Sequence, residues 1–307
     1  SPVTPLEDWV ARKIGLPPDR LTRQALEQYQ WCKLSQTLRH AATASAFYRQ
    51  RLAGLPMAKI ASPAELSTLP FTTEDDLQKN GPAMLCLSQS EISRVVTLDS
   101  SGTVGLPKRL WFTAAEQEQT ADFFRAGMSQ LVRPGDRTLI LLPGERPGSV
   151  GNLLANSLQA IGVAAIVPGP LRCLTDTLRR IEEQQVTALV GTPVQSLSLV
   201  RYAAAVGMKL TSVHSVLLST DYAAASLVNA VQTGWGCQVY NHYGMTEMGL
   251  GGGVECALHN GFHLREVDLL FEIVDPDSGE PVADGCEGEV VFTTLTRRGM
   301  PLIRYRS

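Results

Sequence analysis

Between residues 138 and 241 the chain repeats one pattern, in which a short apolar run is followed by a longer stretch with apolar residues at helical spacing. The predicted strands are TLILLP (138–143), AAIVP (164–168), TALVG (187–191), SVLLS (215–219) and CQVYN (237–241). The predicted helices lie between them, at 149–162, 175–186, 193–207 and 222–236. This alternation predicts an α/β fold whose mostly parallel sheet layers are covered by helices.

Before this block, capping residues predict where helices begin. A long amphipathic helix is expected over residues 19–45. Ser62 precedes a proline at a first helical position, and Thr72 or Thr73 precedes acidic residues that suit the start of a helix. These signals predict a helical N-terminal segment ahead of the sheet.

After Gly244 the pattern changes to strands at 262–276 and 289–295, joined by Gly, Pro and Asp turn residues. Such turns are typical of antiparallel pairing. The sequence therefore predicts a large α/β region over residues 1–250 and a smaller antiparallel β unit at the C-terminal end, residues 251–307.

Composition narrows the classes of function. The chain has 307 residues and a formal net charge of −3, without a Lys/Arg cluster, so nucleic acid is not an expected partner. The longest apolar stretch, residues 153–167, is interrupted by polar residues and is too short to cross a membrane. Six scattered cysteines do not indicate a disulfide framework, so a reducing, cytoplasmic location is expected.

The first chemical signal is the stretch DSSGTVGLPKRLWFT, residues 99–113, whose loop joins strands predicted at 94–98 and 109–112. Backbone N–H groups, hydroxyls and the flexible glycines of such a loop can surround a phosphate, and Lys108 adds a positive charge. The spacing is not that of a P-loop, and a strand follows instead of a helix. An ordinary hairpin turn is the alternative.

Thr113 and Glu116 then form a predicted capping box for a helix over 114–132.

The second signal is YNHYGMTEMGLGGG, residues 240–253, which follows the last predicted parallel strand. It should therefore lie at the carboxyl edge of the sheet, where open α/β sheets bind their ligands.

Together the two stretches resemble the adenylate-forming superfamily, whose phosphate loop is similar to S-S-G-T-T-G-x-P-K and whose second signature is Y-G-x-T-E. Further segments, among them SAFYRQRLAG and LPFTTEDDLQKNGP, resemble the phenylacetate-CoA ligase branch nearly from end to end. The resemblance implies an acid-thiol ligase that uses ATP and Mg²⁺ to activate an aromatic carboxylic acid as an acyl-adenylate and then transfers the acyl group to coenzyme A.

The resemblance also implies roles for residues of this chain. Lys108, Thr246 and Glu247 are the expected catalytic residues: Lys108 and the loop would hold the β- and γ-phosphates, Thr246 the α-phosphate and Glu247 the Mg²⁺. Tyr243 would stack on the adenine, with Asp221 in the acidic position of the adenine-side segment STDYA. The expected nucleotide-binding set is Ser100, Ser101, Gly102, Thr103, Gly105, Tyr243, Gly244 and Asp221.

The same resemblance leaves alternatives open. Family members continue beyond a segment like RYRS, residues 304–307, into a C-terminal domain with a catalytic lysine, so that domain is expected to be absent and the chain incomplete for turnover. A non-catalytic adenylate-binding protein is one alternative. An adenylating enzyme with a carrier-protein or amine acceptor is another. Nothing in the sequence decides which acid is used or whether the chain forms a homodimer.

Two further groups of residues have ambiguous signals. Cys256, His259 and His263 have a spacing compatible with zinc, but four ligands cannot be assembled, so zinc is not favoured. His242 can face a ligand pocket, although a lone histidine at a strand end is more often structural.

Position in the fold suggests residues 191–193 and 143–152 as the lining of the acid pocket.

We predict that Val104→Thr tightens binding of Mg·ATP, because Val104 stands where the family loop has a second threonine. A hydrogen bond to a charged phosphate contributes about 1.5–3 kcal/mol. Calorimetric titration of both proteins measures the difference. Equal affinities would show that the backbone N–H groups hold the phosphates without this hydroxyl.

Overall fold

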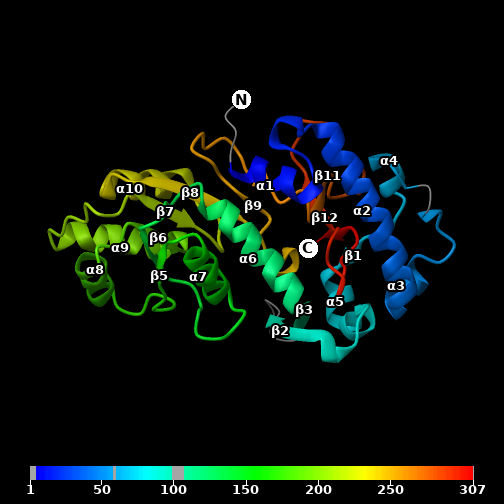
Figure 1. Cartoon of the computed structure of the whole chain (residues 1–307), viewed down its shortest axis with the longest axis horizontal. Coiled ribbons are helices and arrows are strands. Elements are labelled where there is room, and N and C mark those ends of the chain that lie inside the picture. Colours follow the sequence, from blue (N-terminus) through cyan, green and yellow to red (C-terminus); the bar gives the residue numbers. More distant parts are fainter. Residues whose placement is uncertain (1–4, 58–59, 99–106, 307) are drawn as a thin grey trace. The chain divides into compact units, whose positions relative to one another are not determined.

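The computed structural model describes residues 5–57, 60–98 and 107–306. Figure 1 shows the elements in chain order. The helices are α1 (Pro5–Ile14), α2 (Arg23–Ala44), α3 (Ala46–Arg51), α4 (Pro63–Leu66), α5 (Glu74–Asn80), α6 (Ala114–Met128), α7 (Val150–Ala160), α8 (Leu174–Glu183), α9 (Pro193–Ala205) and α10 (Ala225–Trp235). The short 3-10 helices are η1 (Pro18–Arg20), η3 (Gly81–Met84), η4 (Gln89–Glu91) and η5 (Thr246–Met248). The strands are β1 (Thr72–Thr73), β2 (Ile92–Leu98), β3 (Lys108–Thr113), β4 (Arg137–Ile140), β5 (Ala164–Ile166), β6 (Ala188–Gly191), β7 (Ser215–Leu218), β8 (Gln238–Tyr243), β9 (Gly253–Val254), β10 (His263–Leu264), β11 (Leu269–Val274), β12 (Glu289–Thr294) and β13 (Tyr305–Arg306).

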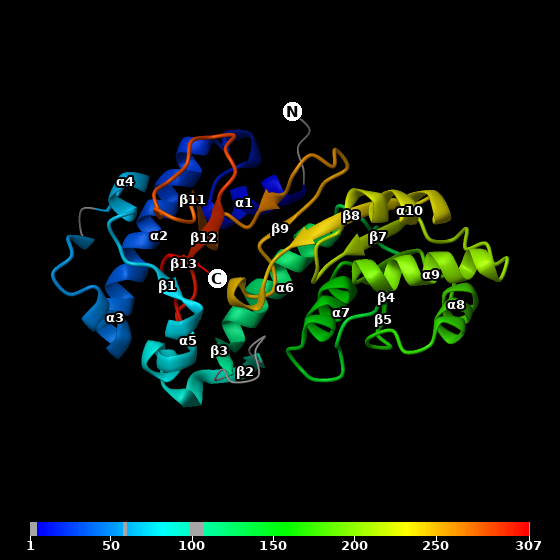
Figure 2. The ribbon, with the colours of Figure 1, turned by 180° about the vertical axis from the view of Figure 1, so that it is seen from behind.

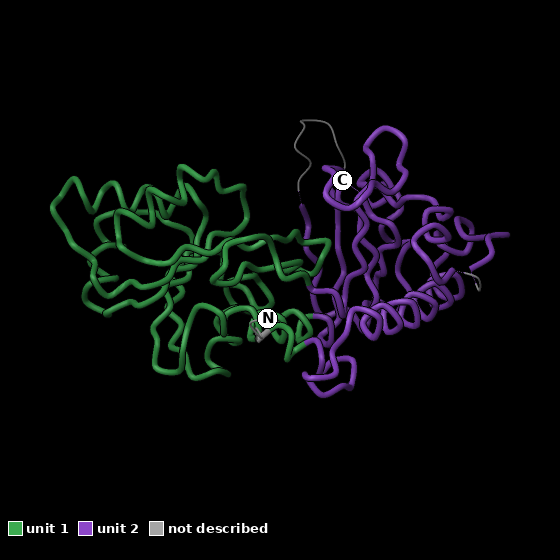
Figure 3. The backbone as a smooth tube through the Cα atoms, turned by 90° about the horizontal axis from the view of Figure 1, so that it is seen from above, with its two compact units in different colours: residues 1–9, 117–264 green, residues 10–116, 265–307 purple. Residues whose placement is uncertain are grey.

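The chain forms two compact units, coloured separately in Figure 3. Unit 1 contains residues 1–9 and 117–264, and unit 2 contains residues 10–116 and 265–307. This division differs from the expected boundary after residue 250. The reason is strand pairing: β13 runs parallel to β1, so the C-terminal strands complete a sheet with a segment from the first quarter of the chain.

In the described part of unit 1 the strands form a seven-stranded sheet in the order β10-β9-β8-β7-β6-β4-β5. The strands from β8 to β5 are parallel, and β9 and β10 add antiparallel pairs at the edge. Helices α7 to α10 surround this sheet (Figures 1 and 2). The predicted α/β fold with a mostly parallel sheet is confirmed.

Successive side chains of the parallel strands point to opposite faces of the sheet, because a β-strand is pleated. Leu139, Leu189 and Val216 belong to a buried cluster that also includes residues of α8, α9 and α10. Their neighbours Val190 and Leu217 point to the opposite face, where they join side chains of α6 and α7. The sheet is therefore buried on both sides, which explains why its strands are continuous apolar runs.

Unit 2 is built on a second sheet, which in the described residues has the order β1-β13-β12-β11, and on the antiparallel pair β2-β3. The antiparallel pairing of β11 with β12 confirms the predicted C-terminal β unit. The buried Tyr48 hydroxyl lies 3.2 Å from Thr72 Oγ1 and accepts a hydrogen bond from the Ile303 N–H. Thr72 in turn donates to the Ile303 carbonyl at 2.7 Å. This network joins α3, β1 and the segment before β13.

A buried ion pair occupies the same region. Arg304 is 1% exposed, and its Nη2 lies 3.0 Å from Oε1 of Glu272, which is 7% exposed. The guanidinium also donates to the carbonyls of Ser67 and Leu69, each at 2.7 Å. Burial raises the pKa of Glu272, and the charge of Arg304 opposes that shift.

The predicted helix caps are confirmed at three positions. Thr73 and Asp76 form a capping box for α5, Ser62 caps α4, and Thr113 and Glu116 form the box that begins α6. The long N-terminal helix begins later than predicted. Thr22 accepts a hydrogen bond from the Ala25 N–H and caps α2, while residues 18–20 form a separate 3-10 turn.

All six cysteines are free thiols in the structure. Across the described residues, none of the helices has both the length and the apolar character required to cross a membrane.

We predict that Glu272→Ala lowers the free energy of unfolding by about 3–5 kcal/mol, because it leaves the buried guanidinium of Arg304 without its counter-ion. Asp75→Ala is the matched control. Asp75 pairs with Lys79 on α5 with both side chains 64% exposed, and its loss should change stability by less than about 1 kcal/mol. Urea unfolding of the three proteins measures both effects. Similar losses in the two variants would contradict the assigned importance of the Glu272–Arg304 pair.

Candidate functional site

The second sequence motif forms a closed turn directly after β8. The Met245 carbonyl accepts hydrogen bonds from the N–H groups of Met248 at 3.1 Å and Leu250 at 3.0 Å. The Tyr243 carbonyl accepts one from the Gly252 N–H at 2.9 Å, which begins the pairing of β8 with β9. The motif thus reverses the chain at the carboxyl edge of the parallel sheet, as its position in the sequence predicts.

Two glycines allow this reversal because the backbone segments approach closely. A Cβ atom on Gly244 would lie 3.0 Å from the backbone nitrogen of Gly252 and 3.1 Å from the Gly251 Cα. A Cβ atom on Gly251 would lie 2.7 Å from the ring of Phe123 on α6. A side chain at either position would push the two segments apart.

The turn places two of the three expected catalytic residues. Thr246 and Glu247 lie in the 3-10 helix η5, with Thr246 partly exposed and Glu247 only 3% exposed. Helix α6 fastens the end of the turn, because the Thr120 hydroxyl donates to the Gly249 carbonyl at 2.8 Å. This hydrogen-bonded turn thus offers a carboxylate, which is a ligand type that a hard cation prefers, next to a hydroxyl that can donate to a phosphate.

The expected adenine-side residues lie at the same edge of the sheet. Tyr243 is half-buried, burial raises the pKa of its hydroxyl, and its ring lies 5.9 Å from that of Phe262. Asp221 follows β7 and is exposed, and its carboxylate accepts a hydrogen bond from the Tyr222 N–H. The structure brings Tyr243, Gly244, Thr246 and Glu247 together in one turn and places Asp221 after the neighbouring strand. Their roles stay predictions.

Lys108 lies in unit 2, at the beginning of β3, and is 13% exposed at its side chain. Its Nζ atom lies 3.2 Å from Oε1 of Glu74, in the first turn of α5. The other expected phosphate-loop residues, Ser100, Ser101, Gly102, Thr103 and Gly105, lie outside the described residues, as does Val104.

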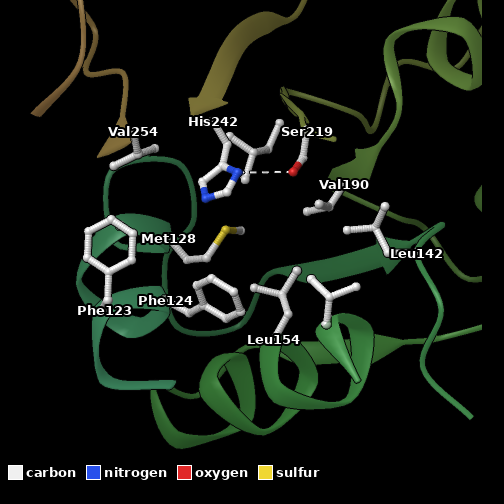
Figure 4. A pocket seen from close by; sticks show the side chains of 12 residues that line it. Phe123, Phe124, Met128, Leu142, Leu154, Val190, Ser219, His242 and Val254 are labelled. Carbon is white, nitrogen blue, oxygen red and sulfur yellow. Dashed lines mark hydrogen bonds between the residues drawn. The ribbon is translucent and has the colours of Figure 1, made fainter. Parts of the chain in front are cut away.

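Unit 1 contains an apolar pocket between α6, α7 and the carboxyl ends of the strands (Figure 4). Most of its lining is aliphatic or aromatic, and none of the described residues that line it is charged. The residues that line it are Phe123, Phe124, Gly127, Met128, Leu142, Val150, Leu154, Val190, Leu217, Ser219, His242 and Val254.

The polar side chains of the lining are a serine and a histidine. Ser219 follows β7 and His242 is in β8, and their Oγ and Nδ1 atoms lie 3.0 Å apart. Nε2 of His242 is buried and has no hydrogen-bond partner among the described residues. Burial lowers the pKa of His242 to about 4, so the ring is neutral at pH 7.

The lining of this pocket differs from the residues expected to line the acid pocket. Val150 is the lining residue that falls within 143–152, and residues 191–193 are not part of the lining. Thr192 instead forms a capping box with Gln195 at the start of α9. His242, which the sequence places where it can face a ligand pocket, is part of the lining. The position of His242 directly before the motif tyrosine is the sequence signal that identifies it. No sequence signal identifies the apolar lining residues that α6 and α7 contribute.

The histidines with zinc-like spacing make other contacts. The Nδ1 atom of His259 lies 3.4 Å from Glu255 Oε2, and its ring lies 5.0 Å from that of Tyr240. Within residues 5–57, 60–98 and 107–306, no three His, Cys, Asp or Glu side chains form a group that could hold a metal ion. Cys256, His259 and His263 are therefore not gathered into a metal site.

Comparison with known families agrees with this geometry. The sequence profile of a family described as "AMP-binding enzyme" matches residues 62–295, which include both motifs. The chain belongs to the AMP-binding enzyme family. The predicted superfamily is thereby confirmed.

Relatives of this chain include phenylacetate-coenzyme A ligases. That of Thermus thermophilus is 28% identical over 94% of this chain and 65% of its own length, and that of Aromatoleum evansii is 28% identical over 95% and 67%. This chain thus spans about two thirds of the length of these relatives. The predicted similarity to the phenylacetate-CoA ligase branch is confirmed.

The fold is shared with solved structures. An open conformation of a 2-hydroxyisobutyryl-CoA ligase in complex with 2-HIB-AMP and CoA has a TM-score of 0.83 with 19% sequence identity, over 94% of this chain and 70% of that chain. At this identity the likeness concerns the fold alone.

We predict that His242 makes the stability of this AMP-binding chain depend on pH. The unfolded histidine takes up a proton near pH 6.5, whereas the folded one does so near pH 4, so folding is favoured above pH 6.5 and this contribution is lost as the pH falls toward 4. The expected loss between pH 7 and pH 5 is about 2 kcal/mol. Urea unfolding at both pH values should show a smaller loss for His242→Phe than for the natural chain. An equal loss would mean that His242 is not the group responsible.

Proposed function

We propose that this chain carries the nucleotide- and acid-binding part of an enzyme that activates an aromatic carboxylic acid with ATP and transfers it to coenzyme A. The observation that carries the proposal is the closed turn with Thr246 and Glu247 beside an apolar pocket at the carboxyl edge of a parallel sheet. Membership of the AMP-binding family and similarity to phenylacetate-coenzyme A ligases support it.

The proposed reaction has two steps. An oxygen of the substrate carboxylate attacks the α-phosphorus of ATP, and pyrophosphate leaves to give the acyl-adenylate. The sulfur of coenzyme A then attacks the acyl carbon, AMP leaves with the electron pair of the broken bond, and the thiol proton is released. Charge accumulates on phosphate oxygens in the first step, so fixed donors and cations stabilise its transition state.

The residues of the two motifs have the proposed roles of stabilising that charge. Glu247 would hold the Mg²⁺, which prefers carboxylate and phosphate oxygens, and Thr246 would donate to the α-phosphate. Lys108 would neutralise charge on the β- and γ-phosphates together with the hydroxyls and N–H groups of residues 100–105. Tyr243 and Asp221 would bind the nucleoside.

The apolar pocket is the proposed site for the hydrocarbon part of the acid. Its uncharged walls favour an aromatic or aliphatic group and disfavour a charged one, because burying an unpaired charge is costly. Val254 and His242, on either side of the closed turn, both line it, so a bound acid would end near Thr246 and Glu247.

We predict that Glu247→Gln weakens binding of Mg·ATP by at least about tenfold, because it removes the charged ligand of the metal. Glu118→Gln is the matched control, since Glu118 is an exposed carboxylate on α6 that pairs with Arg125. The affinity of this control variant for Mg·ATP should equal that of the natural chain. Calorimetric titrations with ATP, in the presence and absence of Mg²⁺, measure the affinities.

Saturable binding of Mg·ATP that an aryl acid strengthens is the result expected of the natural chain. Binding of nucleotide without any effect of acids would favour a non-catalytic adenylate-binding protein. Unchanged Mg²⁺ dependence in Glu247→Gln would contradict the role of Glu247, and an absence of nucleotide binding would contradict the proposed function itself.

A further inference from the structure

His242 has a buried polar atom that the described part of the chain leaves unsatisfied. Its Nδ1 is 3.0 Å from the Ser219 hydroxyl, but its Nε2 has no hydrogen-bond partner among the described residues. Native proteins satisfy most buried polar atoms, because an unsatisfied one is costly. Figure 4 shows this second ring nitrogen directed into the pocket, toward the side lined by Phe124 and Met128. A polar group of a ligand in this pocket would supply a partner for Nε2.

The protein holds the imidazole ring in a defined orientation. Ser219 fixes one edge through Nδ1, and the backbone N–H of Ser219 donates to the Gly191 carbonyl at 3.0 Å, which fixes the serine on β6. The ring of Phe124 meets the imidazole edge to face, with ring centroids 6.4 Å apart. A ring held from these sides presents Nε2 to a fixed point in the pocket.

We propose that Nε2 of His242 binds a hydroxyl group on the acid that enters this pocket, so that the substrate class is a hydroxylated aromatic acid. This inference rests on the proposed function, because the pocket is taken as the acid site. The resemblance to phenylacetate-CoA ligases does not predict it, because an unsubstituted phenyl ring offers Nε2 no partner.

A hydroxyl is the substituent that fits the histidine in either of its neutral forms. Ser219 Oγ can donate to Nδ1 or accept from it, so Nε2 is either an acceptor or a donor. A hydroxyl can both donate and accept, whereas an ether oxygen only accepts. A charged substituent would be buried among apolar walls in which the described part of the chain supplies no charged residue as a counter-ion.

The neutral state of the His242 ring agrees with a preference for a hydroxyl substituent over a charged one. Burial lowers the pKa of His242 to about 4, which excludes the imidazolium form at pH 7. The pocket therefore offers a neutral hydrogen bond in an apolar space, which distinguishes a phenol from both a hydrocarbon and a second carboxylate.

The experiment is a calorimetric titration of the full 307-residue chain, with Mg²⁺ and a non-hydrolysable ATP analogue present. The acids are phenylacetate, its three monohydroxy isomers and the corresponding fluoro isomers, which resemble the hydroxy acids in size but lack the O–H donor. The natural chain should bind one hydroxy isomer about tenfold more tightly than phenylacetate and its fluoro counterpart.

Two variants test whether His242 causes the preference. His242→Phe should remove it, so that the preferred hydroxy isomer and phenylacetate bind within about twofold of each other. His214→Asn is the control, because His214 precedes β7 and lies at the opposite edge of the sheet from Ser219, and it should keep the preference. Nitrogen NMR of the natural chain provides a test without substitution, because the preferred isomer should shift the Nε2 resonance of His242 and phenylacetate should not.

The outcomes separate this inference from the function on which it rests. Equal binding of phenylacetate and all hydroxy isomers, or a preference that survives His242→Phe, would overturn the inference and leave the proposed function standing. Failure of every acid to bind in the presence of nucleotide analogue would overturn both.

Discussion

The close backbone approach at Gly244 and Gly251 is the constraint on which the functional site depends. Because neither residue has a side chain, the segment after β8 can turn back at once and pair as β9, while α6 packs against the turn through Phe123 and Thr120. That packing places Thr246 and Glu247 on a rigid turn and brings the aromatic residues of α6 over the end of the sheet. The turn and the pocket are thus consequences of the same contact.

The described lining of the pocket is apolar except for the hydrogen-bonded pair of Ser219 and His242. The apolar surroundings strengthen the effect of this polar pair. Burial among the apolar walls keeps the imidazole of His242 neutral at pH 7 and makes an unsatisfied nitrogen costly. In a wetter site the same histidine would be solvated and would discriminate little between ligands. Under the proposed role of His242, selectivity would come from one well-placed hydrogen bond, because the apolar walls accept many hydrocarbon shapes.

The second unit is held in part by buried polar groups. Arg304 reaches Glu272 in β11 and two carbonyls near residue 68, and Tyr48 joins β1 to the segment before β13. The contacts of Arg304 with the Ser67 and Leu69 carbonyls, and that of Tyr48 with Ile303, join segments more than two hundred residues apart in the chain. They explain why the compact units cut across the chain order, with the C-terminal strands completing a sheet begun at residue 72.

Local signals in the sequence determined much of this protein. The alternation of apolar runs and helical stretches determined the parallel sheet, because a strand buried on both faces must be continuously apolar, and capping residues such as Thr73 and Thr113 marked the helix starts they occupy. The glycine-rich motif determined the turn after β8. Only the tertiary structure decided which side chains line the pocket, that the second nitrogen of His242 has no hydrogen-bond partner among the described residues, and that residues 10–116 and 265–307 form one unit. Those features depend on contacts between distant segments, and hydrophobic periodicity carries no information about which distant segments meet.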